Sequence, residues 1–143
     1  TDPSETDKSS EKIRMKLIGD RGVEIVMRFE KAQGRIPEDM NESIPNHPGY
    51  DIRSVSKMDQ DEVMYIEVKT MTGTWNSQSS AGLTGREYAD ARKYGEKYWL
   101  YIIEQVDTNP VLFRIQDPSN LVDYYMFDHG WKPVALVHDI EMG

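Results

Sequence analysis

The N-terminal quarter of the chain carries a helical pattern. From residue 10 to residue 34, apolar side chains recur at intervals of three and four positions, which predicts a helix that ends at Gly34. Gly19 or Gly22 is a point where this helix can break. Asp20 would then cap a second helix that begins directly after it.

The central part of the chain changes to a strand pattern. Residues 50–56 and 63–70 are rich in β-branched and aromatic side chains, and the polar stretch 57–62 separates them. Two such runs around a polar turn predict a β-hairpin. The preceding segment, 35–49, contains three prolines. It is predicted as a loop or a short irregular strand, because proline prevents a regular helix.

A second helix and two more strands are predicted in the C-terminal half. Thr84 is a favourable N-cap residue, and Glu87 follows it at the spacing of a capping box, so a helix is expected over 85–96. Residues 98–106 and 111–118 are strongly apolar runs on either side of a short turn, which predicts two paired strands.

The order of these elements predicts a mixed α/β domain. The helix between the two pairs of strands has to cross over the sheet to rejoin it, so we expect a mixed central sheet flanked by helices. The tail 121–140 is expected to hold a short helix and a last strand. We interpret residues 11–143 as one globular domain and residues 1–10 as a flexible linker, and we expect the chain to be a piece of a larger protein.

Composition and charge narrow the classes of function. The 143 residues include no cysteine, which excludes disulfides, thiolate zinc sites and a cysteine nucleophile. The three histidines lack a zinc-binding spacing. No apolar run reaches the roughly 18 residues of a membrane span. We therefore expect an intracellular domain without a membrane partner, cytoplasmic or, in a eukaryote, nuclear. The net charge of −8 argues against strong standalone binding to nucleic acid, but it is compatible with a local basic strip or an acidic metal pocket.

Two carboxylates and a lysine are predicted to meet at one end of the hairpin. Asp51 lies on the first strand, and Glu67 and Lys69 are two residues apart on the second, so the latter two share one face of the sheet. Oxygen ligands from Asp51, Glu67 and the Val68 carbonyl suit Mg²⁺, for which Mn²⁺ would substitute. Lys69 could orient a water or a phosphate. The alternative is an exposed ion pair worth ~0 to 1 kcal/mol.

The residues "GYDI" at 49–52 and "YIEVKT" at 65–70 resemble the active-site pattern of the PD-(D/E)xK nuclease superfamily. More narrowly, the chain resembles the NO VEIN C-terminal domain family over about residues 20–118. The resemblance implies a restriction-endonuclease-like αβββαβ core. It also implies that Asp51 is the first acid, that Glu67-Val68-Lys69 is the (D/E)xK tripeptide, and that Glu24 is an additional upstream acid.

The resemblance further implies a function. It indicates a Mg²⁺-dependent DNA endonuclease domain within a larger restriction or phage-defence protein, with a helicase or ATPase among the attached domains. RNA stays open as a substrate, and a homodimer is a further expectation, since many nucleases of this fold act as pairs. The alternative is a catalytically inactive nuclease-like module that binds nucleic acid or protein. In this chain Gly49 and Tyr50, rather than proline, precede Asp51.

Further residues are candidates for contacts with substrate, each with a structural alternative. Trp75 is either a platform for stacking a base or a residue of the core. Gln78 lies in the same Gly/Ser-rich loop and would be near the substrate. Arg86 and Lys93 on the second helix could contact phosphates, or they form a solvated face. Glu24 has the alternative of being helix surface.

Overall fold

The computed structural model describes residues 3–43, 48–76, 82–121, 132 and 135–141. These residues form a mixed α/β fold with one six-stranded sheet in the order β1-β2-β3-β4-β5-β6. The β3–β4 pair is parallel and the other four pairs are antiparallel. The elements are α1 (Pro3–Ala32), β1 (Arg35–Asp39), α2 (Met40–Ser43), β2 (Ile52–Ser56), β3 (Val63–Thr70), α3 (Gly85–Tyr94), η1 (Gly95–Lys97), β4 (Tyr98–Glu104), β5 (Val111–Gln116), η2 (Pro118–Asn120) and β6 (Leu136–Asp139).

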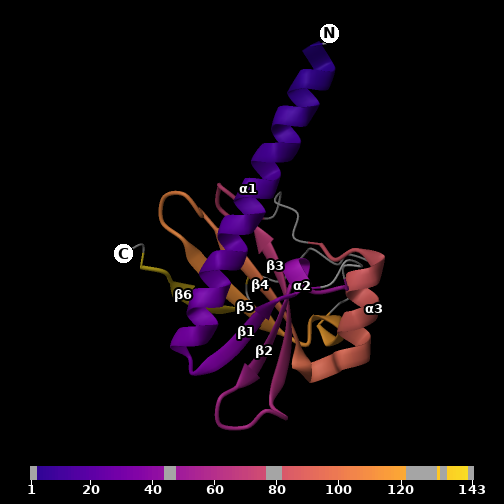
Figure 1. The fold of residues 1–143 in the computed structure, drawn as a ribbon, viewed down its shortest axis with the longest axis vertical. Helices are drawn as coiled ribbons and strands as arrows, with labels where there is room; N and C mark the ends of the chain where they lie inside the picture. Colours follow the sequence, from indigo (N-terminus) through magenta and orange to yellow (C-terminus); the bar gives the residue numbers. More distant parts are fainter. Residues whose placement is uncertain (1–2, 44–47, 77–81, 122–131, 133–134, 142–143) are drawn as a thin grey trace.

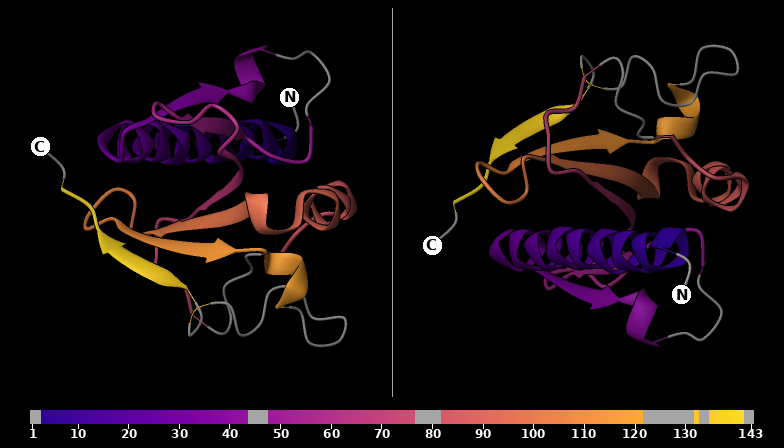
Figure 2. Two further views of the ribbon diagram at one scale, coloured as in Figure 1. Left: turned by 90° about the horizontal axis from the view of Figure 1, so that it is seen from below. Right: turned by 90° about the horizontal axis from the view of Figure 1, so that it is seen from above.

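The two longer helices lie on opposite faces of the sheet. Alternate residues of β3, among them Ile66 and Val68, pack with Ile18 and Val26 of α1. On the other face, Ala91 of α3 packs with aromatic residues of the adjoining strands. Figures 1 and 2 show the sheet bending around α1, with α3 against its outer side. The mixed sheet flanked by helices is thus confirmed, and so is the crossover through α3 that makes β3 and β4 parallel.

Helix α1 runs without the predicted break and starts earlier than expected. It is continuous through Gly19 and Gly22 and begins at Pro3, so residues 3–10, predicted as a flexible linker, are helical. A Cβ on Gly22 would lie 1.8 Å from the Thr70 hydroxyl oxygen, whereas nothing lies within 4 Å of a Cβ on Gly19. Gly22 therefore serves the close approach of α1 to β3 and does not interrupt the helix.

The two glycines give a matched pair of substitutions. Gly22→Ala is expected to destabilise the fold by about 1–3 kcal/mol, because the new methyl group also meets Thr70 Cβ and Cγ2 at 2.9 and 3.0 Å. Gly19→Ala is expected to stabilise it by about 0.5–1 kcal/mol, because alanine is the better helix former and has free space. Urea unfolding followed by circular dichroism measures both. A Gly22→Ala variant as stable as wild type would contradict the close packing.

The remaining strands follow the predicted pattern closely. The β2–β3 hairpin and the β4–β5 pair are both present, and β6 is the predicted last strand. Segment 35–49 contains the strand β1 and also the short helix α2, which no sequence pattern predicted. The short helix expected within 121–140 falls mainly on residues outside the described ranges. No helix among the described residues is long and apolar enough to cross a membrane.

Candidate functional site

Asp51 sits at the start of β2 and extends the hydrogen bonding of the neighbouring strand. Its Oδ2 accepts a hydrogen bond from the backbone N–H of Val68 at 2.8 Å, and its Oδ1 accepts one from Asn41 Nδ2 at 3.3 Å. The Asp51 backbone N–H donates to the Ile66 carbonyl at 2.8 Å. The carboxylate is therefore fixed beside β3 at the point where β2 no longer pairs with it.

The contacts of Gly49, which precedes Tyr50 and Asp51, require a glycine at this position. The Gly49 N–H donates to Asp90 Oδ2 at 2.9 Å, and its carbonyl accepts from the Tyr98 hydroxyl at 2.7 Å. A Cβ at this position would lie 2.6 Å from the backbone oxygen of Arg86. The segment leading to Asp51 is thus held against α3 and β4, at a distance that only glycine allows.

Glu67 and Lys69 share the α3 face of β3, as their spacing predicts. Lys69 Nζ lies 3.4 Å from Glu67 Oε2 and 2.9 Å from Glu87 Oε1. The side chain of Glu67 is 5% exposed and that of Glu87 13% exposed, so the exposed ion pair considered as the alternative does not describe this site. The partly buried Lys69 lies between the buried carboxylate of Glu67 and the partly buried carboxylate of Glu87.

The charges of this cluster shift one another's pKa values. Burial, followed by the Asp51 charge, raises the pKa of Glu67 well above its usual value, although Lys69 acts in the opposite sense. Burial alone would lower the pKa of Lys69, but the charge of Glu67 and the hydrogen bond to Glu87 raise it. Burial also opposes ionisation of Glu87, yet the hydrogen bonds from Thr84 and Lys69 lower its pKa. The site therefore favours a positive Lys69 next to an ionised Glu87.

The donor set at the end of β3 fits a hard divalent cation. Glu67 Oε1 is a buried oxygen without a hydrogen-bond partner among the described residues, and such an orphaned acceptor favours a cation. The N–H and C=O of one strand residue point to the same edge, so the Val68 carbonyl faces the same side as its N–H, toward Asp51. Two carboxylates and this carbonyl match what Mg²⁺ takes from proteins. Within the described ranges, however, no group of three or more His, Cys, Asp or Glu side chains is arranged around a metal position.

The buried charge of Glu67 should be visible in the stability of the metal-free chain. Since its pKa is raised in the folded state, stability is highest below the unfolded glutamate pKa of about 4.3 and falls as the pH rises through the folded value. Glu67→Gln should therefore be more stable than wild type at pH 7, by on the order of 1 kcal/mol, with Lys69 still paired to Glu87. Urea unfolding in EDTA between about pH 4 and pH 8 measures this. Parallel pH profiles for the two proteins would contradict it.

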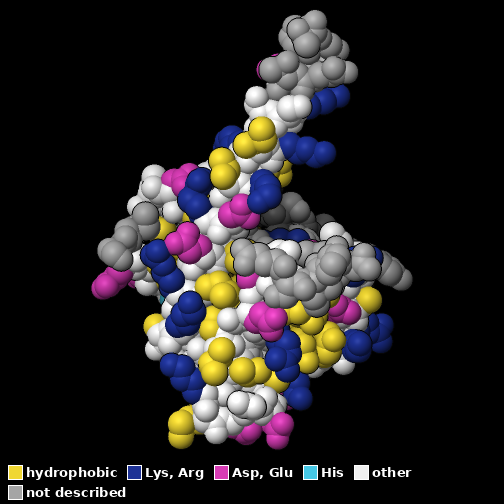
Figure 3. All heavy atoms as spheres, viewed as in Figure 1, with side chains coloured by type: hydrophobic (Ala, Val, Ile, Leu, Met, Phe, Trp, Pro, Cys, Tyr) yellow, Lys and Arg dark blue, Asp and Glu magenta, His cyan; other side chains and the backbone are white. Residues whose placement is uncertain are grey.

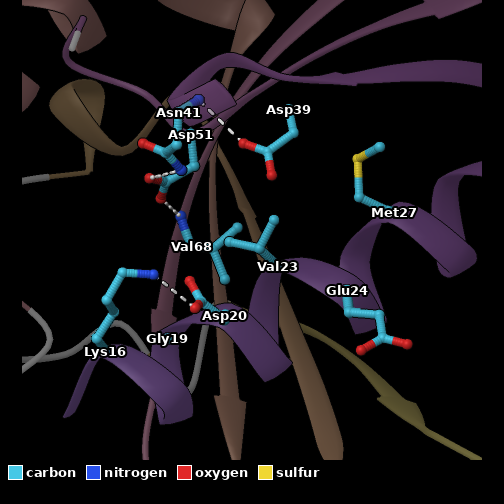
Figure 4. A pocket seen from close by; sticks show the side chains of 10 residues that line it. All are labelled: Lys16, Gly19, Asp20, Val23, Glu24, Met27, Asp39, Asn41, Asp51 and Val68. Carbon is cyan, nitrogen blue, oxygen red and sulfur yellow. Dashed lines mark hydrogen bonds and ion pairs between the residues drawn. The ribbon is translucent and has the colours of Figure 1, made fainter. Parts of the chain in front are cut away.

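Glu24 is not brought to the Asp51 carboxylate. It lies on α1, which packs against the face of the sheet opposite to Glu67, and its side chain is 61% exposed and paired with Arg28 at 2.7 Å. Figure 4 shows the Glu24 carboxylate pointing away from Asp51, although both residues line one cleft. This geometry fits the alternative of a solvated helix surface.

The four residues predicted to bind substrate differ in their exposure to solvent and in whether the structure describes them. Trp75 is 2% exposed and packs edge-to-face on Phe113 with ring centroids 5.2 Å apart, so the stacking platform is wrong and Trp75 is a core residue. Gln78 lies outside the described residues. Arg86 and Lys93 are exposed on α3, and Lys93 Nζ lies 5.1 Å from the centroid of the Tyr94 ring.

The sequence predicted the contact of Glu87 with Thr84 but not its contact with Lys69. The capping box is confirmed, since Glu87 Oε1 accepts from the Thr84 N–H at 2.9 Å. The same oxygen contacts Lys69, which the capping signature could not reveal. Asn41, Asp90 and Tyr98 also support the Asp51 segment. They come from three different elements, so no local pattern linked them to Asp51.

A cleft of about 830 Å³ opens beside Asp51, between α1 and the segment that carries α2 (Figure 4). Val68 forms part of its wall, and α1 contributes both apolar and charged side chains. The cleft gives a ligand access to the Asp51 side of the sheet. Its lining residues are Lys16, Gly19, Asp20, Val23, Glu24, Met27, Asp39, Asn41, Asp51 and Val68.

Comparison with known proteins identifies one family. The model of the family described as "Protein NO VEIN, C-terminal" matches residues 18–115, which is more than half of the 143-residue chain. The matched region runs from α1 to β5 and includes Asp51, Glu67, Lys69 and Glu87. No curated protein and no solved structure was found to match.

Proposed function

We propose that this chain, which belongs to the NO VEIN C-terminal family, is a Mg²⁺-dependent phosphodiesterase domain that cuts DNA. The observation that carries the proposal is the cluster at the end of β3. There, Asp51 is fixed to the Val68 N–H, and Lys69 lies between Glu67 and Glu87. Glu67 also presents a buried oxygen that has no hydrogen-bond partner in the described part of the chain. These are the residue types that phosphodiester hydrolysis requires at one place.

The element order supports a restriction-endonuclease-like core for this domain. Apart from the short helices α2 and η1, the elements α1-β1-β2-β3-α3-β4 follow the αβββαβ order expected for that fold, and the parallel β3–β4 pair is joined by the crossover helix α3. Fold resemblance alone does not establish chemistry. The proposal therefore rests on the side chains, with the PD-(D/E)xK pattern placed on Asp51 and on Glu67-Val68-Lys69.

The residues divide the work of hydrolysis. Asp51 and Glu67, with the Val68 carbonyl, would hold Mg²⁺ or Mn²⁺, which when bound acidifies a water and neutralises charge on the phosphate. Lys69 orients the attacking water or stabilises the negative charge that develops on the phosphate oxygens. Glu87 and Thr84 fix the position of Lys69 through the cap of α3. Because the net charge is −8, further domains of the parent protein, such as a helicase or ATPase, would help to deliver the DNA.

A cleavage assay tests this function. The chain is incubated with supercoiled, linear double-stranded and single-stranded DNA, and with RNA, in Mg²⁺, in Mn²⁺ and in EDTA. The proposal expects metal-dependent cleavage of DNA that the Lys69→Met variant lacks. Cleavage that persists in EDTA, or that is equal in wild type and variant, would contradict it, while preferential cleavage of RNA would change the substrate.

A non-catalytic interaction module is the second candidate, and one observation favours it. Lys69 is already engaged by two carboxylates, and the described residues hold no ready-made group of three metal-binding side chains. In this case the cluster would only stabilise the junction of β3 and α3. The two candidates differ in metal binding. A nuclease would be stabilised by about 2.7 kcal/mol at a Mg²⁺ or Mn²⁺ concentration of 100 times Kd, whereas a purely structural cluster would show no shift in Tm.

A further inference from the structure

Three lysines form a stripe along the projecting part of α1. Lys8, Lys12 and Lys16 are four residues apart in one helix, so they lie along one side over about 12 Å. All three are exposed. Figures 1 and 3 show this part of α1 extending beyond the sheet, with Lys and Arg side chains gathered on it. These three residues are called the lysine stripe below.

The lysine stripe leads to the cleft beside Asp51. Lys16 itself lines that cleft. At about 100° per residue, Gly19 and Val23, which also line it, fall on the side of α1 that carries the stripe. The same angles turn Asp7 and Glu11 away from the centre of the stripe by about 140° and about 100°. The side of α1 that carries the lysine stripe therefore continues, through Lys16, into the wall of the cleft beside Asp51.

The charges near the lysine stripe leave it largely available to a ligand. Glu11 is paired with Arg14 at 3.1 Å, on another side of the helix. Lys16 is paired with Asp20 at 2.8 Å, with side chains that are 76% and 59% exposed. An ion pair this exposed contributes little to stability, and Lys16 can exchange Asp20 readily for another anion. A local strip of positive charge on a chain of net charge −8 points to a polyanionic ligand.

We propose that the lysine stripe binds the phosphate backbone of double-stranded DNA and directs it into the Asp51 cleft. This rests on the proposed function, since it names the surface that brings the substrate to that site. The duplex carries one phosphate per 3.4 Å of helix axis on each strand, so a stripe of about 12 Å spans an axial length that holds three or four phosphates of each strand. Contacts of this kind position the duplex without reading its sequence. The lysine stripe would thus let the chain bind DNA locally, although its net charge is negative.

Binding of a fluorescent duplex of about 20 base pairs tests the inference. Anisotropy is measured without divalent metal at several salt concentrations, so that binding is separated from cleavage. In the stripe variant, Lys8, Lys12 and Lys16 are replaced by glutamine. The matched control carries Arg14→Gln, Arg28→Gln and Lys31→Gln, which removes the same charge from other sides of α1.

The stripe variant is expected to bind the duplex at least about tenfold more weakly than wild type. The slope of log K against log salt concentration should become smaller by about two to three, while the control variant stays close to wild type. Equal losses in the two variants, or no duplex binding by the wild-type chain, would overturn the inference. Hydrolysis of bis(p-nitrophenyl) phosphate by the wild-type chain with Mg²⁺ is measured separately. If the duplex binds through the stripe but this hydrolysis is absent, the proposal of a DNA-binding surface stands and the proposal of a nuclease is rejected.

Discussion

Asp51→Asn is expected to reduce metal-dependent DNA cleavage by about 10³-fold or more, which corresponds to a barrier higher by at least about 4 kcal/mol. The Asn carbonyl oxygen can still accept the hydrogen bond from the Val68 N–H, so the strand end keeps its geometry. The variant loses the negative charge that attracts the cation. Loss of activity in a folded protein would therefore report on the metal site and not on misfolding.

The measurement combines cleavage with thermal melting. Wild type should gain Tm on addition of Mg²⁺ or Mn²⁺, and Asp51→Asn should lose most of that gain while its Tm in EDTA stays within a few degrees of wild type. Asp61→Asn is the matched control, because Asp61 is an exposed residue in the β2–β3 turn and the substitution removes the same charge. An Asp51→Asn protein that cleaves like Asp61→Asn would refute the assignment of Asp51.

Lys69→Met should separate catalysis from metal binding. Methionine keeps much of the side-chain volume but removes the charge that lies 3.4 Å from Glu67 and 2.9 Å from Glu87. Cleavage is expected to fall by about 10² to 10³-fold, the usual effect of losing one group that stabilises transition-state charge. Metal-induced stabilisation should persist or increase, because the cation then becomes the main positive charge available to both carboxylates.

The same pair of measurements decides the outcome for Lys69. Retained metal stabilisation with lost cleavage supports a role in the reaction itself. If Lys69→Met instead loses the metal response in parallel with activity, the lysine serves the assembly of the site and not the reaction. Lys97→Met is a suitable control, since Lys97 is exposed in η1 at the start of β4.

Much of the fold could be predicted because its signals are local. The capping box of Thr84 and Glu87 fixes the start of α3, and alternating side chains fix the hairpin β2–β3. Gly19 and Gly22 were misleading for the opposite reason. Helix propensity treats the two positions alike, whereas packing against Thr70, far away in sequence, decides what Gly22 does. The strand β1 was only partly predicted, since its central proline is compatible with an edge strand and equally with a loop.

The site could be predicted only where its members follow strand spacing. Glu67 and Lys69 share a face because they are two residues apart, and Asp51 joins them through the hairpin. Glu87 reaches Lys69 only through the crossover helix, and a residue that already satisfies a local signature gives no sign of a second partner. Trp75 shows the converse: its loop position favoured a surface role, but the apolar core beneath the loop buries it.

The proline in β1 also limits how copies of this domain can associate. Gly34 accepts a hydrogen bond from Lys57, and Met40 donates one to Asp51, so the even-numbered positions of this strand bond to β2 and the odd-numbered ones point to its free side. Pro37 is one of these and has no N–H to offer at the middle of the strand. A second chain adding to this edge would lack its central hydrogen bond, so the edge is protected against continuous sheet formation and aggregation.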